Sequence, residues 1–136
     1  MQKGQVSFDL ILAIIVALIF IGSIQVVNQE MDVLQKYSAV KNQEKLMALQ
    51  IYGVVSTAKT LSDADNLTIN FKTKKLLVPG AQVLEECLID FVTNTISYTL
   101  DETDVSVDIP DYGDTSGLIL PTPQITCGEV ITITNS

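Results

Sequence analysis

The residues able to do chemistry are few in this chain of 136 residues. It has no histidine, so neither a Ser-His-Asp triad nor a Cys-His nucleophile can be built, and the commonest metal ligand is absent. The two cysteines, Cys87 and Cys127, are too few for a zinc site and do not form a Cys-x-x-Cys redox motif. We therefore expect no enzyme activity and no cofactor.

Carboxylates are the most concentrated polar groups. The segment DETDVSVDIPDYGD, residues 101–114, contains six of them, and oxygen-rich clusters can hold Ca²⁺. Its spacing does not match the EF-hand loop, so an acidic surface loop is the main interpretation and a Ca²⁺ site the alternative. Tyr112, in the middle of this segment, is a candidate for an exposed adhesive contact. The net charge of −8, with lysine as the only basic residue type, disfavours nucleic acid as a partner.

Asp9 is a carboxylate in an unusual place, at the start of a long apolar run. Residues 10–27 read LILAIIVALIFIGSIQVV, with no charge. As a helix this segment would be about 27 Å long, close to the thickness of a bilayer's hydrocarbon core. A secretory signal peptide and a plain membrane anchor are both compatible with such a run. The first would need a positive leader and a small-residue cleavage site, but Asp9 offsets Lys3 and Gly22-Ser23 is a poor site.

The helical pattern continues to about residue 61. No proline interrupts the segment, and apolar residues recur at helical spacing, at Met31, Leu34, Val40, Met47, Ile51, Val54, Ala58 and Leu61. The run 41–45 is assigned to the polar face. One helix from about Ser7 to Leu61 is the main prediction, and a break near Asn28 or Gly53 is the alternative.

From residue 62 the pattern changes to that of a β-rich domain. Alternating LTINFKT predicts a half-buried strand, and Pro79-Gly80 predicts a turn. TISYTL, DVSVDI, GLIL, QIT and EVITIT predict further short strands, whereas AQVLEECLIDFVTN, residues 81–94, predicts a short helix. We expect an α+β fold in which an antiparallel sheet covers the amphipathic half of a long N-terminal helix.

Two features suit an extracellular head. Cys87 and Cys127 predict one disulfide, which would close a loop of about 40 residues and add about 4 kcal/mol; two buried free thiols are the alternative. Asn66-Leu67-Thr68 is a sequon for N-glycosylation, although Asn66 would also serve as a turn residue.

The N-terminal residues also match a known pattern. KGQVSFD followed directly by an apolar helix resembles the class III signal peptide of archaeal type IV pilins. In that family a short basic leader is cut after Gly and before Gln, and the mature chain keeps its apolar helix. Gly4 and Gln5 match the processing site, and Ser7 and Asp9 match the third and fifth mature positions. The family usually has Glu in place of Asp9, and often Leu in place of Ala13.

The resemblance implies a structural subunit rather than an enzyme. Residues 1–4 would be the leader removed by a prepilin peptidase, 5–27 the membrane and filament-core helix, 28–61 its amphipathic continuation, and 62–136 the extracellular head. Other partners would be copies of the chain, a membrane assembly platform and, before assembly, lipid. The precursor would lie in the membrane with its leader in the cytoplasm, and the mature chain in an extracellular filament that adheres to surfaces.

The resemblance also gives Asp9 a role. Cleavage would place a free amine on Gln5, and the Asp9 carboxylate of one subunit would pair with the Gln5 amine of a neighbour. In the alternative interpretation Asp9 only sits among lipid headgroups or favours the N-terminal dipole of its helix. The corresponding alternative function is a membrane-anchored surface domain, binding a ligand or Ca²⁺, that never polymerises.

Overall fold

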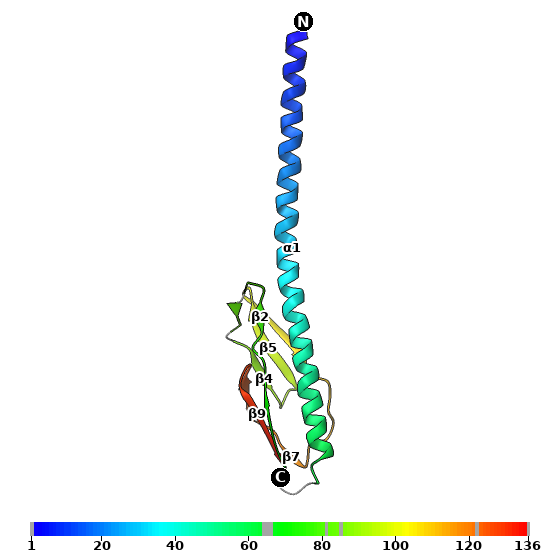
Figure 1. Ribbon diagram of the computed structural model, residues 1–136, viewed down its shortest axis with the longest axis vertical. Coiled ribbons are helices and arrows are strands. Elements are labelled where there is room, and N and C mark those ends of the chain that lie inside the picture. Colours follow the sequence, from blue (N-terminus) through cyan, green and yellow to red (C-terminus); the bar gives the residue numbers. More distant parts are fainter. Residues whose placement is uncertain (1, 64–66, 81, 85, 122, 136) are drawn as a thin grey trace. The chain divides into compact units, whose positions relative to one another are not determined.

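The computed structural model describes residues 2–63, 67–80, 82–84, 86–121 and 123–135; it describes only the backbone of residues 2–7 and 82. The chain divides into two compact units, Met1–Tyr37 and Ser38–Ser136. The first unit is helical throughout its described part, and the second holds the end of the same helix and all the strands (Figure 1).

A single helix, α1, runs from Gln2 to Thr60 without a break. The prediction of one helix is therefore confirmed, and the alternative break near Asn28 or Gly53 is wrong. The helix begins before Ser7 and ends one residue before Leu61. Its last turn carries Lys59, a favourable charge for the negative end of the helix dipole.

The strands form three antiparallel sheets in the second unit. A three-stranded sheet has the order β1 (Thr68–Lys72), β9 (Val130–Asn135), β7 (Leu118–Ile119). A two-stranded sheet pairs β2 (Leu77–Val78) with β3 (Gln82–Val83). A four-stranded sheet has the order β6 (Thr103–Asp108), β5 (Thr95–Leu100), β4 (Leu88–Asp90), β8 (Ile125–Thr126). The five sequence segments expected as strands beyond residue 94, and the one at residues 67–73, all contain strands.

The core of the second unit lies between its part of α1 and the sheets. The helix buries one stripe of side chains, which includes Val40, Met47, Ile51, Val55 and Ala58. Every second residue of the long strands faces the same core, as in Ile96, Tyr98 and Leu100 of β5 and Ile131 and Ile133 of β9. The predicted α+β fold, with antiparallel sheets packed on the long helix, is confirmed.

The helix expected over residues 81–94 is wrong. This segment instead contains β3, β4 and a turn over residues 91–94. The carboxylate of Asp90 accepts hydrogen bonds from the backbone N–H groups of Val92 (2.7 Å) and Thr93 (3.1 Å), and Asn94 has a φ of 54°. An aspartate that bonds the backbone two residues on stabilises a turn in competition with a helix. The apolar residues that fit a helical spacing here instead lie in or next to β4, which pairs with β5 and β8.

Candidate functional site

The apolar part of α1 has exposed side chains on every side. Exposure is 67% for Phe8, 63% for Leu18 and 67% for Phe20, which lie on different faces of the helix. The helix from Phe8 to Thr60 contains an 18-residue window apolar enough to cross a membrane, and no part of that window is buried inside the structure. Burying such surface is worth roughly 25 cal/mol per Å², so an apolar environment would stabilise this segment, which is compatible with membrane insertion.

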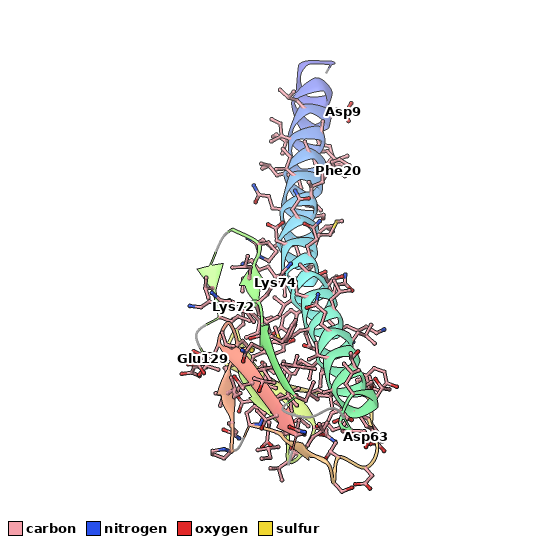
Figure 2. The ribbon with its side chains drawn as sticks, turned by 60° about the horizontal axis from the view of Figure 1, so that its bottom comes forward. Asp9, Phe20, Asp63, Lys72, Lys74 and Glu129 are labelled. Atoms are coloured by element: carbon pink, nitrogen blue, oxygen red, sulfur yellow. A yellow bond between two sulfur atoms is a disulfide. The ribbon has the colours of Figure 1, made fainter. Side chains whose placement is uncertain are left out.

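Asp9 lies at one end of a shallow hollow on this apolar surface. The hollow is lined by Asp9 together with Leu12, Ala13, Val16, Ala17 and Phe20; Figure 2 labels the two ends, Asp9 and Phe20. Ala13 and Ala17 follow Asp9 at steps of four residues, so they share its helix face. Small residues on such a face allow another helix to approach closely. The face that carries the carboxylate is thus also a face suited to helix packing.

The residues of the predicted processing site lie just before this hollow. The backbone at Gly4, Gln5 and Ser7 is helical and belongs to α1. Their side chains lie outside the described part of the structure, so their predicted roles in cleavage and assembly stay predictions. Asn66, the candidate glycosylation site, is also outside the described residues.

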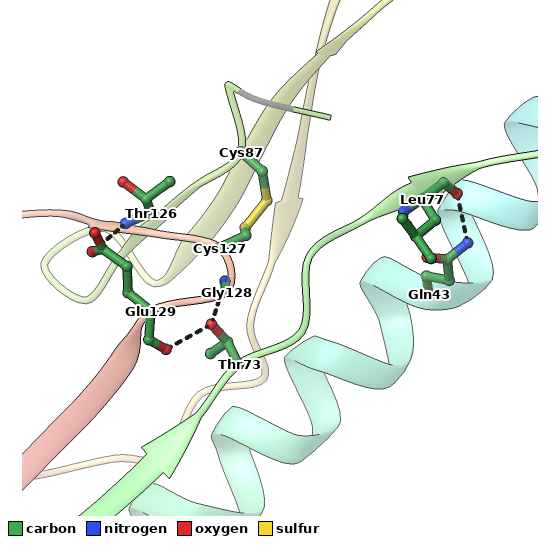
Figure 3. The surroundings of a disulfide bond; sticks show 8 residues. All are labelled: Gln43, Thr73, Leu77, Cys87, Thr126, Cys127, Gly128 and Glu129. Carbon is green, nitrogen blue, oxygen red and sulfur yellow. Dashed lines mark hydrogen bonds between the residues drawn. A yellow bond between two sulfur atoms is a disulfide. The ribbon is translucent and has the colours of Figure 1, made fainter. Parts of the chain in front are cut away.

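Cys87 and Cys127 form the predicted disulfide, and the alternative of two free thiols is wrong. Their Cα atoms are 5.3 Å apart, and both side chains are buried. Figure 3 shows the bond where Cys87 precedes β4 and Cys127 follows β8. The backbone N–H of Cys127 also donates to the carbonyl of Cys87, at 2.9 Å. The disulfide therefore joins the start of β4 to the end of β8, near the C-terminal end of the chain.

Thr73 connects β1 with the turn after Cys127, a contact that the sequence did not indicate. Its buried hydroxyl accepts a hydrogen bond from the N–H of Gly128 (2.8 Å) and donates to the carbonyl of Glu129 (3.1 Å) (Figure 3). Gly128 has a φ of +95°, a conformation that L side chains rarely adopt, and a Cβ there would lie 2.6 Å from Cγ of Lys75. The turn therefore requires glycine.

The β2 strand is attached to α1 by one side chain. Gln43 donates from Nε2 to the carbonyl of Leu77 (2.8 Å) and accepts at Oε1 from the N–H of the same residue (2.9 Å) (Figure 3). An amide side chain thus pairs with the strand backbone as another strand would. Gln43 belongs to the run 41–45, which was assigned to the polar face for its composition alone.

Glu44, from the same run, contradicts that assignment. Its side chain is 1% exposed, within the helix–sheet core. Burial raises the pKa of Glu44 above its ordinary value, while the Tyr98 hydroxyl, which bonds the carboxylate, and the charge of Lys41 oppose that rise. Oxygen Oε2 has no hydrogen-bond partner. The composition of the run does not show that Glu44 is buried. Its helical spacing does, because Glu44 lies on the same stripe as Val40, Met47 and Ile51.

Tyr112 is buried, so the prediction of an exposed adhesive contact is wrong. Its hydroxyl donates to Asn94 Oδ1 and lies 3.4 Å from the carbonyl oxygen of Phe91. Burial and the charges of Asp111 and Asp90 raise the pKa of Tyr112. Lys59 Nζ donates to the Tyr112 carbonyl at 3.2 Å, which connects the end of α1 to this loop. Tyr112 thus has a structural role.

The acidic segment is held by turns in which carboxylates bond nearby backbone. Asp111 accepts from the N–H of Gly113 (2.8 Å), and Asp114 from the N–H of Ser116 (2.9 Å). The hydrogen bonds from Ser116 lower the pKa of Asp114. Among the described residues, no group of three or more Asp, Glu or Cys side chains is placed to hold a metal ion. Asp111 and Asp114 are therefore turn-forming residues, whereas Asp104 and Asp108 of the same segment lie in β6.

Comparison of the chain with protein-family models, with curated proteins and with solved structures finds no match. What the chain does must therefore be argued from its own residues. The arrangement offers a long helix with an unburied apolar segment, a carboxylate that shares an apolar face with two alanines, and a disulfide-bonded β-rich region. Its long apolar N-terminal helix is compatible with membrane insertion and, together with the β-rich region, with a pilin-like fold.

Proposed function

We propose that this chain is a structural subunit of an extracellular filament of the archaeal type IV pilus kind. It polymerises through its apolar helix and adheres to surfaces through its head. The observation that carries the proposal is the hollow at Asp9, where a carboxylate and two small residues share one face of a fully exposed apolar helix. It has no catalytic role, and its partners are other copies of itself, a prepilin peptidase, an assembly platform in the membrane and, before assembly, lipid.

The position of Asp9 supports assembly over simple anchoring. A carboxylate costs on the order of 2–3 kcal/mol at the centre of a bilayer and less toward the interface, where Asp9 would lie, and an anchor gains nothing from it. Within a filament core, the same group would meet the new N-terminal amine of Gln5 on an adjacent helix. A buried pair of this kind fixes axial register, because a subunit shifted along the helix axis leaves both charges unpaired in an apolar setting.

Processing comes before this pairing. Cleavage between Gly4 and Gln5 removes the leader with Lys3 and creates the amine. Because those residues are helical in the structure, the peptidase must unwind the first turn of α1 to reach an extended backbone. The mature chain then starts at Gln5 and moves from the membrane to an extracellular filament. Mass spectrometry of native material measures this directly, and a start at Met1 or beyond Ser23 would contradict the proposal.

The decisive variant is Asp9→Asn. It leaves the Gln5 amine unpaired in a desolvated core, a penalty of about 3–5 kcal/mol per buried pair broken. We expect the variant to be expressed, inserted and cleaved, but recruited poorly into filaments, as measured by the ratio of sheared to membrane-bound subunit. Asp9→Glu, which keeps the carboxylate, should assemble nearly normally.

Asp32→Asn is the matched control, since it removes an exposed carboxylate from the same helix outside the apolar segment. We expect its ratio to equal that of the wild type. The second candidate function, a single-span anchor for a surface domain that binds a ligand or Ca²⁺, is favoured by the exposed apolar segment alone. It predicts that Asp9→Asn behaves like Asp32→Asn, so equal ratios would reject polymerisation through Asp9.

A further inference from the structure

The outer surface of the four-stranded sheet is acidic and rich in hydroxyl groups. Register places Asp104 opposite Thr99, Ser106 opposite Ser97 and Asp108 opposite Thr95, while the intervening β5 residues are buried. Asp90 pairs with Thr95 from the other side and shares the same surface. We call this surface the acidic face; it comprises Leu88, Thr95, Ser97, Thr99, Asp104, Ser106 and Asp108. The carboxylate of Asp90, at its edge, is engaged by the N–H groups of Val92 and Thr93 and by the Gln124 amide. The acidic face contains no basic residue, and a shallow hollow crosses it around Ser97, Thr99 and Asp104.

The three-stranded sheet has an outer surface of the opposite character. Asn70 and Lys72 of β1 alternate with half-buried Ile69 and Phe71, and lie opposite Thr132 and Val130 of β9. Lys74 and Lys75 follow β1, and all three lysines are exposed; Figure 2 labels Lys72 and Lys74. Lys74 and Lys75 line a shallow hollow beside α1, together with Gln43, Leu46 and Gln50. We call the lysine face the outer surface of β1 and β9, with Thr68, Asn70, Lys72, Val130 and Thr132, together with these two exposed lysines that follow β1.

One carboxylate lies close to the lysine face. Glu129 immediately precedes β9, and its Oε2 accepts a hydrogen bond from the N–H of Thr126, at 3.3 Å. Glu129 is therefore engaged within its own turn. The two faces lie on different sheets of one compact unit, so their charges are available to another molecule rather than to each other.

We propose that the acidic face of one copy of the chain docks on the lysine face of the next copy. The inference rests on the proposed function and adds a second contact, between heads, to the contact between apolar helices. A second copy is the occupant that fits, because each copy supplies both complementary surfaces. Contact between two different faces is heterologous, so it repeats from copy to copy and produces a ring or an open filament rather than a two-fold dimer. Contacts of this kind select partners by charge and weaken as salt rises.

Charge exchange within the full-length chain tests this contact. One variant reverses the lysine face (Lys72→Glu with Lys74→Glu), another reverses the acidic face (Asp104→Lys with Asp108→Lys), and a third combines all four changes. The combined variant keeps the net charge of −8 and restores complementarity with the signs exchanged. We expect each single-face variant to give about tenfold less sheared filament than wild type at low salt, and the combined variant to recover most of it. Recovery also shows that the substituted heads fold.

A cross-link checks the contact without reversing any charge. Cells that co-express Lys74→Cys and Asp108→Cys chains should give a disulfide-linked dimer in sheared filaments, and cells with either variant alone should give far less. The result that overturns the proposal is normal assembly of both single-face variants together with no mixed dimer. Loss of filaments in all three charge variants with no mixed dimer also overturns it, since restored complementarity then has no effect.

The outcomes distinguish this contact from the proposed function. If wild-type chain makes no filament, the proposed function fails. If wild-type filament forms and depends on Asp9 but is indifferent to the charges of the two faces, only the contact between heads fails. If a single-face variant assembles normally but loses adhesion to a charged surface, the face binds that surface instead of a second copy, and the inference is rejected.

Discussion

Glu44 makes the stability of the head depend on pH in a direction opposite to that of most carboxylates. Its folded-state pKa is raised above the ordinary value of 4.5, chiefly by burial. Below pH 4.5 the side chain is protonated in both the folded and the unfolded chain, so its contribution to stability is fully present. Between 4.5 and the raised pKa, the folded state holds one more proton than the unfolded state. Stability must therefore fall as pH rises through that window.

The slope of stability against pH follows from the one additional proton that the folded state holds on Glu44. A difference of one bound proton changes the free energy of unfolding by about 1.4 kcal/mol per pH unit. Glu44→Gln keeps the size and the oxygen that Tyr98 contacts but removes the proton. We expect the free energy of unfolding of the variant to exceed that of wild type by an amount that grows with pH across the window, by at most this slope. The difference should level off above the raised pKa. Asp90 and Asp114 have lowered pKa values, so their contributions are lost only as pH falls below about 3.8, outside this window.

The assay is urea unfolding of the full-length chain in detergent, followed by the circular dichroism of the sheets from pH 4 to pH 8. Tyr98→Phe provides a second test, because the Tyr98 hydrogen bond lowers the pKa of Glu44. Its removal should extend the pH-dependent fall to higher pH, and adding Glu44→Gln should abolish that extension. A difference between Glu44→Gln and wild type that is flat from pH 4 to pH 8 would refute the reasoning, since it would mean that Glu44 ionises equally easily in both states.

Two further predictions concern the disulfide and the hollow at Asp9. Replacing Cys87 and Cys127 together by Ala should lower the free energy of unfolding by about 4 kcal/mol, from the entropy of a loop with a sequence separation of 40. Urea midpoints should show reductant destabilising wild type but not the variant, and a variant as stable as oxidised wild type would contradict this. Ala17→Leu fills the hollow and should reduce sheared filament, whereas Gly22→Leu, on the opposite helix face, should reduce it less. Equal losses in a shearing assay would show that this hollow is not a packing face.

Periodicity was sufficient to predict most of the fold. The strict alternation in TISYTL and VITITN reflects strands with one buried face, and both are strands in the structure. Continuous helical spacing without proline likewise predicted α1. The failure at 81–94 has a local cause. Leu84, Cys87, Leu88 and Phe91 fit a helical stripe, but the turn at Asp90 and the bond to Cys127 hold the chain in a strand instead. The pairing of β4 with β5 and β8 thus outweighed the local helical spacing of the apolar residues.

The candidate site was less predictable, for a different reason. Cys87 and Cys127 could be paired because a chain with two cysteines offers only one pairing. Glu44 was missed because a charged side chain is normally exposed, although its spacing puts it on the stripe of Val40, Met47 and Ile51. Tyr112 could not be placed, since only the packed loop shows that it is buried. Asp9 stands between these cases. Its sequence context marked it as unusual, and the structure adds its shared face with Ala13 and Ala17.

The two units differ in what stabilises them. The second unit, Ser38–Ser136, has a core of its own, closed by a disulfide and by side-chain contacts such as Thr73 with Gly128 and Gln43 with Leu77. The apolar segment of α1 has no core, since none of its most apolar window is buried within the chain. Substitutions in the core of the second unit therefore act mainly on folding, whereas substitutions around Asp9 act on what the segment contacts outside the chain. This separation makes the Asp9→Asn test specific, because a variant that is inserted and cleaved, has a stable, disulfide-bonded head and still forms no filaments has lost an intermolecular contact of the helix.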